Sequence, residues 1–310
     1  MNIQASVWRP WYTAVWGKHS LEEQIALAKL LQADTISIKG VNGVYVYGAE
    51  ENFSALSPFR AHSNDAMERA AKDAGLEVDL WCWVDCKQPT AQARAIQDAV
   101  KRWNPRRVKL DVEGNVAKAY AHNTGAFLRS LGRLKRHDGT HVQIYLQSYR
   151  RPDLHREIAW EKWLTYEAEG DFILAGVAPQ AYPMGSQDFV GDYGRMLEAY
   201  ASLERQIGRE LDWHVTLPTF RERGWSPDPD ALIAGIDLLR AELGDRLVGV
   251  DFWRLGQLFE PWAEPLVTAL AAYDWGPASP EPAQPFLELP EPMRWEIVRD
   301  DLAERGVIAA

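Results

Sequence analysis

The chain has 310 residues, which suits either one large barrel with insertions or two ordinary domains. Apolar residues make up 46% of the chain and charged residues 25%, a composition typical of a globular protein with a sizeable core. The net charge is -10 and no run of Lys or Arg interrupts it, so a nucleic-acid partner is excluded by repulsion from phosphates.

The N-terminus and the lengths of the apolar stretches bear on the cellular location and on contact with a membrane. The N-terminus has neither a basic region nor an apolar core, so no signal peptide is expected. No apolar stretch reaches the roughly 20 residues that a membrane helix needs, and we expect no membrane contact. These features predict a protein of the cytoplasm or, if exported without a signal, of a phage particle.

Eight short segments rich in β-branched and aromatic residues recur along the chain, and each is typical of a strand. They are Ala5–Trp8, Thr35–Lys39, Glu77–Trp83, Arg107–Glu113, Val142–Ser148, Ile173–Gln180, Trp213–Pro218 and Leu247–Trp253.

Amphipathic segments with helix signals separate these strands. Ser20 and Glu23 form a capping-box pattern at the start of one. Other expected helices are Asn64 to Ala74, Thr90 to Trp103 and Asp230 to Leu243. Repeated strand–helix alternation predicts an α/β fold, a (β/α)8 TIM barrel. An open doubly wound sheet is the alternative, but it would normally show a Gly-rich turn after the first strand, where this chain has Arg9-Pro10-Trp11-Tyr12.

Two segments interrupt the alternation of strands and helices. The stretch 41–62 is long for a strand–helix connection and is expected to cover one side of the barrel mouth. Beyond Trp275 the sequence becomes Pro-rich and then helical over Glu291 to Arg305. We therefore expect a barrel over 1–275 and a Pro-rich linker with a short C-terminal helix over 276–310. That tail is a candidate docking segment for a protein partner.

The fourth strand carries the strongest chemical signal. Lys109, Asp111 and Glu113 alternate with two apolar residues, so the three charged side chains should face the barrel interior. Lys109 is expected to neutralise Asp111, while Glu113 lies nearest the mouth. Two carboxyl groups on one face can divide the roles of proton donor and charged partner, as glycoside hydrolysis requires. The structural alternative is a buried Lys–Asp pair with Glu113 in a loop.

Other strand ends offer aromatic rings to stack on sugars and polar groups to bond their hydroxyls. The predicted substrate-binding residues are Trp8, Trp83, Asp85, Tyr145, Gln147, Gln180, Tyr182, His214, Asp251 and Trp253.

Metal and cofactor sites are not indicated. The seven histidines form no HxH or HExxH pattern, and neither a P-loop nor a GxSxG elbow occurs. Cys82 and Cys86 lie four apart, which matches no common zinc spacing, so we interpret them as two buried thiols rather than a redox pair or half a metal site. The sequence therefore predicts no cofactor.

Several of these segments resemble known families. Leu110-Asp111-Val112-Glu113 is similar to the DxE signature of the family 25 glycoside hydrolases, the muramidases, and the strands ending near Gln147, Tyr182 and Asp251 resemble theirs. Family 18 chitinase-like barrels share part of the pattern, but their DxDxE motif would place Lys109 at the first Asp. The muramidases also carry an Asp on the first strand, where this chain reads Ser6-Val7-Trp8-Arg9.

The resemblance implies a glycosidase that cleaves an amino-sugar polymer such as peptidoglycan. Glu113 would be the proton donor and Asp111 its orienting or charge-stabilising partner, with Asp85 a candidate replacement for the first-strand Asp. A second hypothesis is a barrel without catalysis that binds glycan or serves as a structural part of a phage-like assembly. A reactive lysine that forms a Schiff base is possible at Lys39 or Lys109, and a third, weaker hypothesis is an isomerase or aldolase that uses Lys109.

Overall fold

The computed structural model of the protein describes residues 5–8, 19–50 and 62–275, with residues 5–8 and 115–117 as backbone only. The expected Pro-rich tail over 276–310, with its helix, lies outside the described residues. So does the part of the 41–62 stretch from residue 51 to residue 61.

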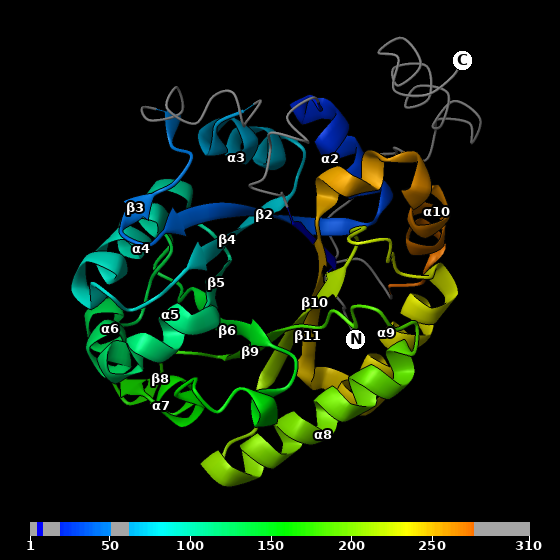
Figure 1. The fold of residues 1–310 in the computed structure, drawn as a ribbon. Coiled ribbons are helices and arrows are strands. Elements are labelled where there is room, and N and C mark those ends of the chain that lie inside the picture. Colours follow the sequence, from blue (N-terminus) through cyan, green and yellow to red (C-terminus); the bar gives the residue numbers. More distant parts are fainter. Residues whose placement is uncertain (1–4, 9–18, 51–61, 276–310) are drawn as a thin grey trace.

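Eight parallel strands close into a ring, as Figure 1 shows. The first strand, β1, pairs in parallel with both β2 and the last strand, β11, and this pairing closes the ring. In ring order the strands are β1 (Ala5–Trp8), β2 (Ala33–Asn42), β4 (Glu77–Trp83), β5 (Arg107–Asp111), β6 (Gln143–Tyr149), β9 (Gly176–Gln180), β10 (Asp212–Pro218) and β11 (Leu247–Trp253). The predicted (β/α)8 barrel is confirmed.

Helices surround the ring on its outer side (Figure 1). The α-helices are α2 (Leu21–Leu30), α3 (Asn64–Asp73), α4 (Pro89–Trp103), α5 (Gly114–Ala119), α6 (Thr124–Leu131), α7 (Trp160–Leu164), α8 (Phe189–Ile207), α9 (Pro229–Leu243) and α10 (Glu264–Ala272). Short 3-10 helices are η2 (Ala121–Asn123), η3 (Pro152–Leu154), η4 (Gly244–Arg246), η5 (Leu255–Phe259) and η6 (Pro261–Ala263). Within the described ranges, no helix is long and apolar enough to span a membrane.

Local sequence signals set the helix ends where they were expected. The Ser20 hydroxyl accepts a hydrogen bond from the Glu23 amide (3.1 Å), and the Glu23 carboxylate accepts one from the Ser20 amide, which completes the capping box. At the start of α3 the Ser63 hydroxyl accepts a hydrogen bond from the Ala66 amide (3.1 Å), and Gly75 follows that helix with a positive φ of 74°, a conformation that glycine adopts at low cost.

Several strands differ from the prediction in their bounds. The fourth, expected to run from Arg107 to Glu113, ends at Asp111, so Glu113 lies two residues beyond it. The second strand continues to Asn42 and then turns back into β3 (Tyr45–Val46), which pairs antiparallel with β2, so the stretch after Val41 does not begin as a loop. The sixth strand begins at Gly176 rather than Ile173. A Cβ at Gly176 would lie 1.9 Å from the Asp212 carbonyl oxygen, and only glycine permits this close approach of β9 and β10. A two-stranded hairpin, β7 (Glu167–Ala168) with β8 (Asp171–Phe172), comes before it.

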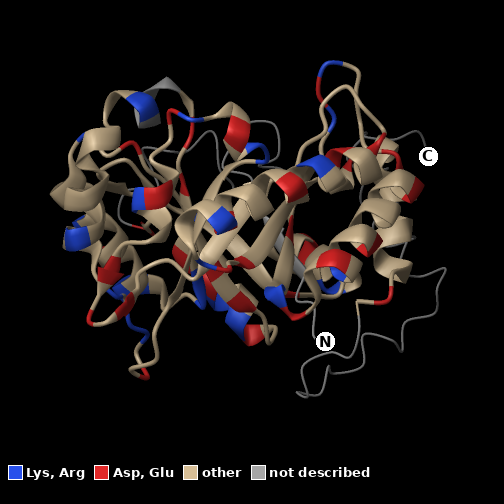
Figure 2. Ribbon diagram, turned by 90° about the horizontal axis from the view of Figure 1, so that it is seen from below, with Lys and Arg blue, Asp and Glu red and all other residues tan. Residues whose placement is uncertain are grey.

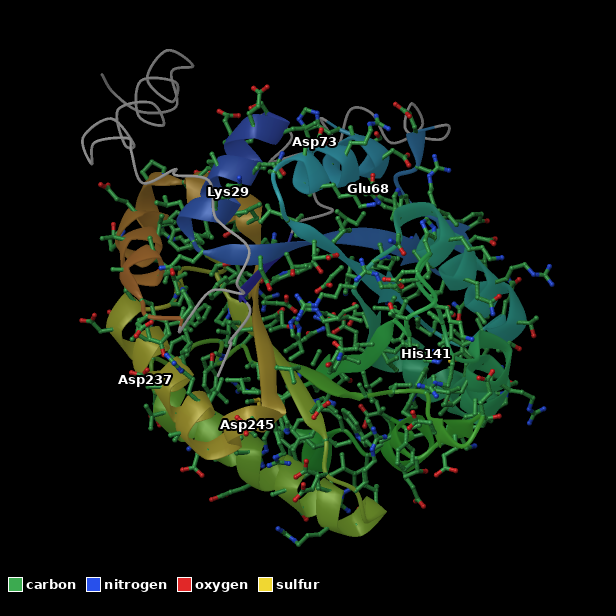
Figure 3. The ribbon with its side chains drawn as sticks, turned by 180° about the vertical axis from the view of Figure 1, so that it is seen from behind. Lys29, Glu68, Asp73, His141, Asp237 and Asp245 are labelled. Atoms are coloured by element: carbon green, nitrogen blue, oxygen red, sulfur yellow. The ribbon has the colours of Figure 1, made fainter. Side chains whose placement is uncertain are left out.

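Side-chain alternation divides the barrel into two environments. Outward-facing residues such as Val108, Leu110 and Val215 are fully buried between strands and helices, where they form the apolar core. Their inward-facing neighbours are mostly polar or aromatic, and Figure 3 shows side chains filling the space within the ring. Charged residues of both signs are interspersed over the rest of the ribbon (Figure 2). The side chains that could take part in catalysis or binding therefore lie inside the ring.

Candidate active site

Five ionisable side chains meet inside the barrel, and we call them the interior cluster: Asp79, Arg107, Lys109, His214 and Asp251. All five are at most 1% exposed. The Arg107 guanidinium lies 2.8 Å from an Asp79 oxygen. The Lys109 ammonium contacts Asp251 and lies 3.6 Å from Asp79. Two cations thus face two carboxylates, and their charges cancel.

His214 joins the two halves of the interior cluster. Arg107 donates a hydrogen bond to its Nε2 (2.6 Å), which leaves the ring proton on Nδ1, 2.9 Å from an Asp251 oxygen. Burial lowers the pKa of His214 well below its usual value, and the nearby charges of Lys109 and Arg107 lower it further. The imidazole is therefore neutral at pH 7.

Three of these residues have the composition of a metal site. Potential ligand atoms of Asp79, His214 and Asp251 lie within 4.8 Å of one another. However, Lys109 contacts both carboxylates, and Arg107 bonds Asp79 and His214. Because the protein's own cations hold these positions, the cluster does not fit a metal ion.

This arrangement corrects the predicted partner of Lys109. The sequence indicated that Lys109 neutralises Asp111, two residues along the same strand. Instead, Lys109 pairs with Asp251 and Asp79, and the ammonium whose charge acts on Asp111 is that of Lys39. The i and i+2 positions of a strand share a face, but their side chains lean toward different neighbouring strands. Lys109 is also fully buried and lies between carboxylates, which argues against its role as a reactive amine.

Asp111 and Glu113 lie at the C-terminal end of β5, and we call them the carboxyl pair. Asp111 is 1% exposed, while Glu113 is partly exposed. The Gln180 side-chain amide donates to Asp111 (3.0 Å) and also bonds Glu113, so it joins the two groups from β9. The indole N–H of Trp81 donates to Asp111 as well.

Both members of the carboxyl pair are poised to hold a proton. Burial raises the pKa of Asp111 well above its usual range, and the negative charge of Glu113 raises it further. Burial also raises the pKa of Glu113. The Gln180 hydrogen bonds oppose both increases. Since two neighbouring buried acids resist being ionised together, the pair can hold one proton between them.

Aromatic rings flank the carboxyl pair. Trp81 lies 5.3 Å from Trp253 between ring centroids, and Tyr182 packs edge-on against Phe220 at 5.3 Å. Burial raises the pKa of Tyr182, and so do the charges of Asp111 and Glu113, which places its hydroxyl in the electrostatic field of the pair. Of the predicted substrate-binding residues, Gln180, Tyr182 and Trp253 are thus brought together with the predicted catalytic ones.

Other predicted site residues lie deeper or elsewhere. His214 and Asp251 belong to the interior cluster and are fully buried. Tyr145 is also fully buried, with its ring 5.7 Å from His214. Gln147 is 1% exposed and donates to Thr216 (3.3 Å).

The remaining three have different positions. Trp83 ends β4 and is partly exposed. Asp85 accepts hydrogen bonds from the Lys87 amide (2.9 Å) and the Gln92 side chain, so it organises the turn into α4. Among the described residues it makes no contact with the carboxyl pair. Trp8 lies on β1, but its side chain falls outside the described part of the chain.

Lys39, Trp81 and Tyr149 are not among the predicted catalytic or substrate-binding residues, although the sequence places Trp81 and Tyr149 at strand ends. Lys39 and Trp81 occupy inward positions on neighbouring strands. The Tyr149 hydroxyl accepts a hydrogen bond from the Gly114 amide (2.7 Å), next to Glu113. Strand alternation alone could have identified Lys39, because an isolated lysine between apolar neighbours on a strand is expected to face the interior.

The two cysteines are free and buried, as expected. Burial raises the pKa of the Cys86 thiol to about 12, with the charge of Asp85 a second cause. Burial also raises the pKa of Cys82. Both side chains therefore stay protonated thiols at neutral pH, without nucleophilic character.

Comparison with known proteins supports the fold. No family model matches the chain, and no curated protein does. Solved structures that are similar include a family 18 N-acetylglucosaminidase from Paenibacillus barengoltzii, with 12% identity over 87% of this chain and 99% of that one, at a TM-score of 0.57. A family 18 chitinase from Pseudoalteromonas aurantia has 12% identity over 86% and 98% of the two chains, at a TM-score of 0.52.

A third similar structure is a chitinase-like agglutinin from Robinia pseudoacacia, with 9% identity over 88% of this chain and all of that one, at a TM-score of 0.54. The similarity is to glycoside hydrolase barrels of the chitinase-like kind, and the finer resemblance to family 25 muramidases stays a prediction. At these identities the comparisons show that the chain has the fold of a chitinase-like (β/α)8 barrel.

Proposed function

We propose that the protein is a glycoside hydrolase that cleaves an amino-sugar polymer, with Glu113 as the general acid and Asp111 as its charged partner. The observation that carries the proposal is the carboxyl pair at the C-terminal end of β5, joined through Gln180. The C-terminal ends of the strands are where barrel enzymes build their active sites.

The raised pKa of Glu113 supports its role as the proton donor. Protonated Glu113 gives its proton to the glycosidic oxygen as the bond from that oxygen to the anomeric carbon breaks. The electron pair of the broken bond stays on the departing oxygen. Ionised Asp111 stabilises the positive charge that develops on the sugar. Water then adds its oxygen to the anomeric carbon, and the proton it releases returns to Glu113.

Aromatic surroundings support a sugar as the substrate. Trp253 is partly exposed and lies against Trp81, and the Tyr182 ring is close enough to be affected by both carboxyl charges. Aromatic faces stack on the apolar faces of sugar rings, and hydroxyls such as that of Tyr182 bond their polar edges. The DxE resemblance favours peptidoglycan, and the names of the similar solved structures make chitin the second polymer to test.

The test is release of reducing ends from purified peptidoglycan and from chitin. Glu113→Gln preserves the size of the side chain and removes its acid, so activity should fall by about 10²- to 10⁴-fold while circular dichroism stays unchanged. Glu210→Gln, on an exposed glutamate before β10, is the matched control and should retain full activity. No release by the unmodified protein from either polymer would contradict the proposal.

A second candidate is a barrel that binds glycan without cleaving it. Two observations favour it: Lys109 stands where a chitinase-like motif would have its first Asp, and one similar solved structure is an agglutinin. Saturable binding of chitin or peptidoglycan fragments by calorimetry, without release of reducing ends, would decide for this candidate.

A further inference from the structure

Glu113 lies outside the hydrogen-bonded ladder of the barrel. Asp111, the last residue of β5, is paired with Trp83 of β4 and Gln147 of β6, whereas Glu113 comes two residues later. Gly114 follows it with a positive φ of 72° and begins α5. A catalytic group must be held within about 0.5 Å of its productive position, so an acid beyond the ladder needs support from other bonds.

Two side-chain hydroxyls at the end of β6 bond the residues on either side of Glu113, and we call them the hydroxyl bracket. The Ser148 hydroxyl donates to the carbonyl oxygen of Val112 (2.6 Å). The Gly114 amide donates to the hydroxyl oxygen of Tyr149 (2.7 Å). The main chain is thus bonded to β6 immediately before and immediately after the acid.

The hydroxyl bracket is itself held in place. Ser148 is fully buried. The Tyr149 ring is stacked on the His155 ring, with centroids 3.6 Å apart and planes 15° from parallel, and the carbonyl oxygen of Tyr149 accepts a hydrogen bond from the Tyr200 hydroxyl on α8 (2.9 Å). A rigid strand end therefore supports the segment that carries Glu113.

The bond to Gly114 is not one that folding requires. The first amides of a helix have no partner within the helix, and Gly114 is exposed, so water can bond its amide instead. A hydrogen bond that water can replace contributes little net stability. What the Tyr149 hydroxyl fixes is the place of the main chain next to the acid.

The next residue of the chain extends this support to a second strand. The Arg150 guanidinium donates to the carbonyl oxygen of Tyr182 (2.8 Å), just beyond the end of β9. Because β6 lies between β5 and β9 in the ring (Figure 1), its end bonds the segments that carry Glu113 and Tyr182 on either side.

We propose that Ser148 and Tyr149 are positioning residues, whose two hydroxyls hold Glu113 in place for proton transfer to the glycosidic oxygen. The effect on rate rests on the proposed glycosidase function, whereas the bonds to the main chain can be tested without a substrate.

The first measurement is amide hydrogen exchange at Gly114, followed by NMR in the full chain. Labelling with ¹³C-carbonyl Glu and ¹⁵N-Gly selects two Glu–Gly pairs, at Gly114 and Gly170, and Glu113→Gln removes the first of them from the spectrum. In Tyr149→Phe the Gly114 amide should exchange about two- to tenfold faster, the range that corresponds to the loss of one hydrogen bond. Tyr273→Phe, which removes a hydroxyl bonded to Asp237 (2.6 Å) on α9, is the matched control and should leave the rate unchanged.

The second measurement is the release of reducing ends from peptidoglycan and chitin by the same variants and by Ser148→Ala. A displaced acid slows proton transfer without changing how the polymer binds, so kcat should fall by about tenfold in each single variant and by up to about 10²-fold in the double variant. KM should change by less than about twofold, and Tyr273→Phe should retain the wild-type kcat. If Ser148→Ala does not fold, Tyr149→Phe alone decides the test.

The outcomes separate this inference from the proposed function. An unchanged exchange rate at Gly114 in Tyr149→Phe would overturn the inference even if the enzyme is active. A rise in KM with kcat unchanged, or an equal loss of kcat in Tyr273→Phe, would also overturn it. A wild type that hydrolyses neither polymer, but whose Gly114 amide exchanges faster in Tyr149→Phe, would overturn the proposed function and support the hold of the hydroxyl bracket on the segment around Glu113.

Discussion

The interior cluster and the carboxyl pair occupy one barrel and share one strand, yet their charges are organised in opposite ways. In the interior cluster two carboxylates meet two cations around a neutral imidazole, so each charge has a partner. In the carboxyl pair two acids neighbour each other, burial raises the pKa of both, and a single cation acts on one of them. Matched charges stabilise a fold, while mismatched ones hold a titratable proton for chemistry.

The largest expected effect on stability comes from removing one of the two cations of the interior cluster. Lys109→Met leaves Asp251 and Asp79 buried with one cation fewer, and losing one partner of a buried ion pair costs about 3–5 kcal/mol of unfolding free energy. Urea unfolding at pH 7 measures it. Lys72→Met on the surface should change stability by less than about 0.5 kcal/mol. A Lys109→Met protein as stable as the wild type would show that the cluster is not structural.

Removing the orphaned charge should recover part of that loss. Asp251→Asn in the Lys109→Met background deletes the carboxylate that the missing ammonium left behind, so the double variant should be more stable than the sum of the single losses predicts. We expect a coupling energy of about 0.5–3 kcal/mol from the double-mutant cycle in urea. Strict additivity of the two losses would mean that the two side chains do not interact across β5 and β11.

The carboxyl pair should respond in the opposite direction. A carboxyl group whose pKa is raised in the folded state contributes stability at low pH and loses it as pH rises through that pKa. For Asp111 burial raises the pKa, so at pH 7 its ionised form opposes folding. Asp111→Asn should therefore stabilise the protein by about 1 kcal/mol at pH 7, a typical size for a single substitution, and abolish hydrolysis.

Thermal unfolding at pH 7 and at pH 4 tests this sign. The gain from Asp111→Asn should shrink at pH 4, where the wild-type carboxyl group is neutral too. Destabilisation of equal size at both pH values would instead assign Asp111 a structural role like that of the interior cluster.

The barrel could be predicted from the sequence because its signals are local. Strand alternation, the capping box at Ser20 and the glycine after α3 depend on residues close in the chain. The inward direction of Lys109 and Asp111 also follows from alternation alone. What periodicity cannot supply is the identity of the neighbour across the barrel, which is why Lys109 was paired with the nearest acid in sequence.

The same limit applies to the depth of two predicted site residues, His214 and Asp251. His214 and Asp251 were read as substrate contacts because they lie in strands near the expected mouth. Both are fully buried, and the partners that hold them, Arg107 and Lys109, come from β5, more than 100 residues away in the chain. Alternation places Lys39 inside the barrel, but its neighbour Trp81 belongs to another strand and becomes known only from the closed ring.

The smallest expected effect is a change in the pH dependence of stability at His214. Its folded pKa is lowered by burial, so below the unfolded value near 6.5 the unfolded chain binds a proton that the folded chain does not. Stability that is present above pH 6.5 is therefore lost as pH falls, by about 0.7 kcal/mol between pH 7 and pH 6 for this one group.

His214→Gln, which keeps a neutral polar side chain, should remove this slope, the change in unfolding free energy between pH 7 and pH 6, whatever the substitution does to stability at pH 7. Urea unfolding at both pH values measures the slope, and His137→Gln, on an exposed histidine, should preserve it. A slope that survives unchanged in His214→Gln would show that other groups cause it and that His214 binds its proton equally well in the folded and the unfolded chain.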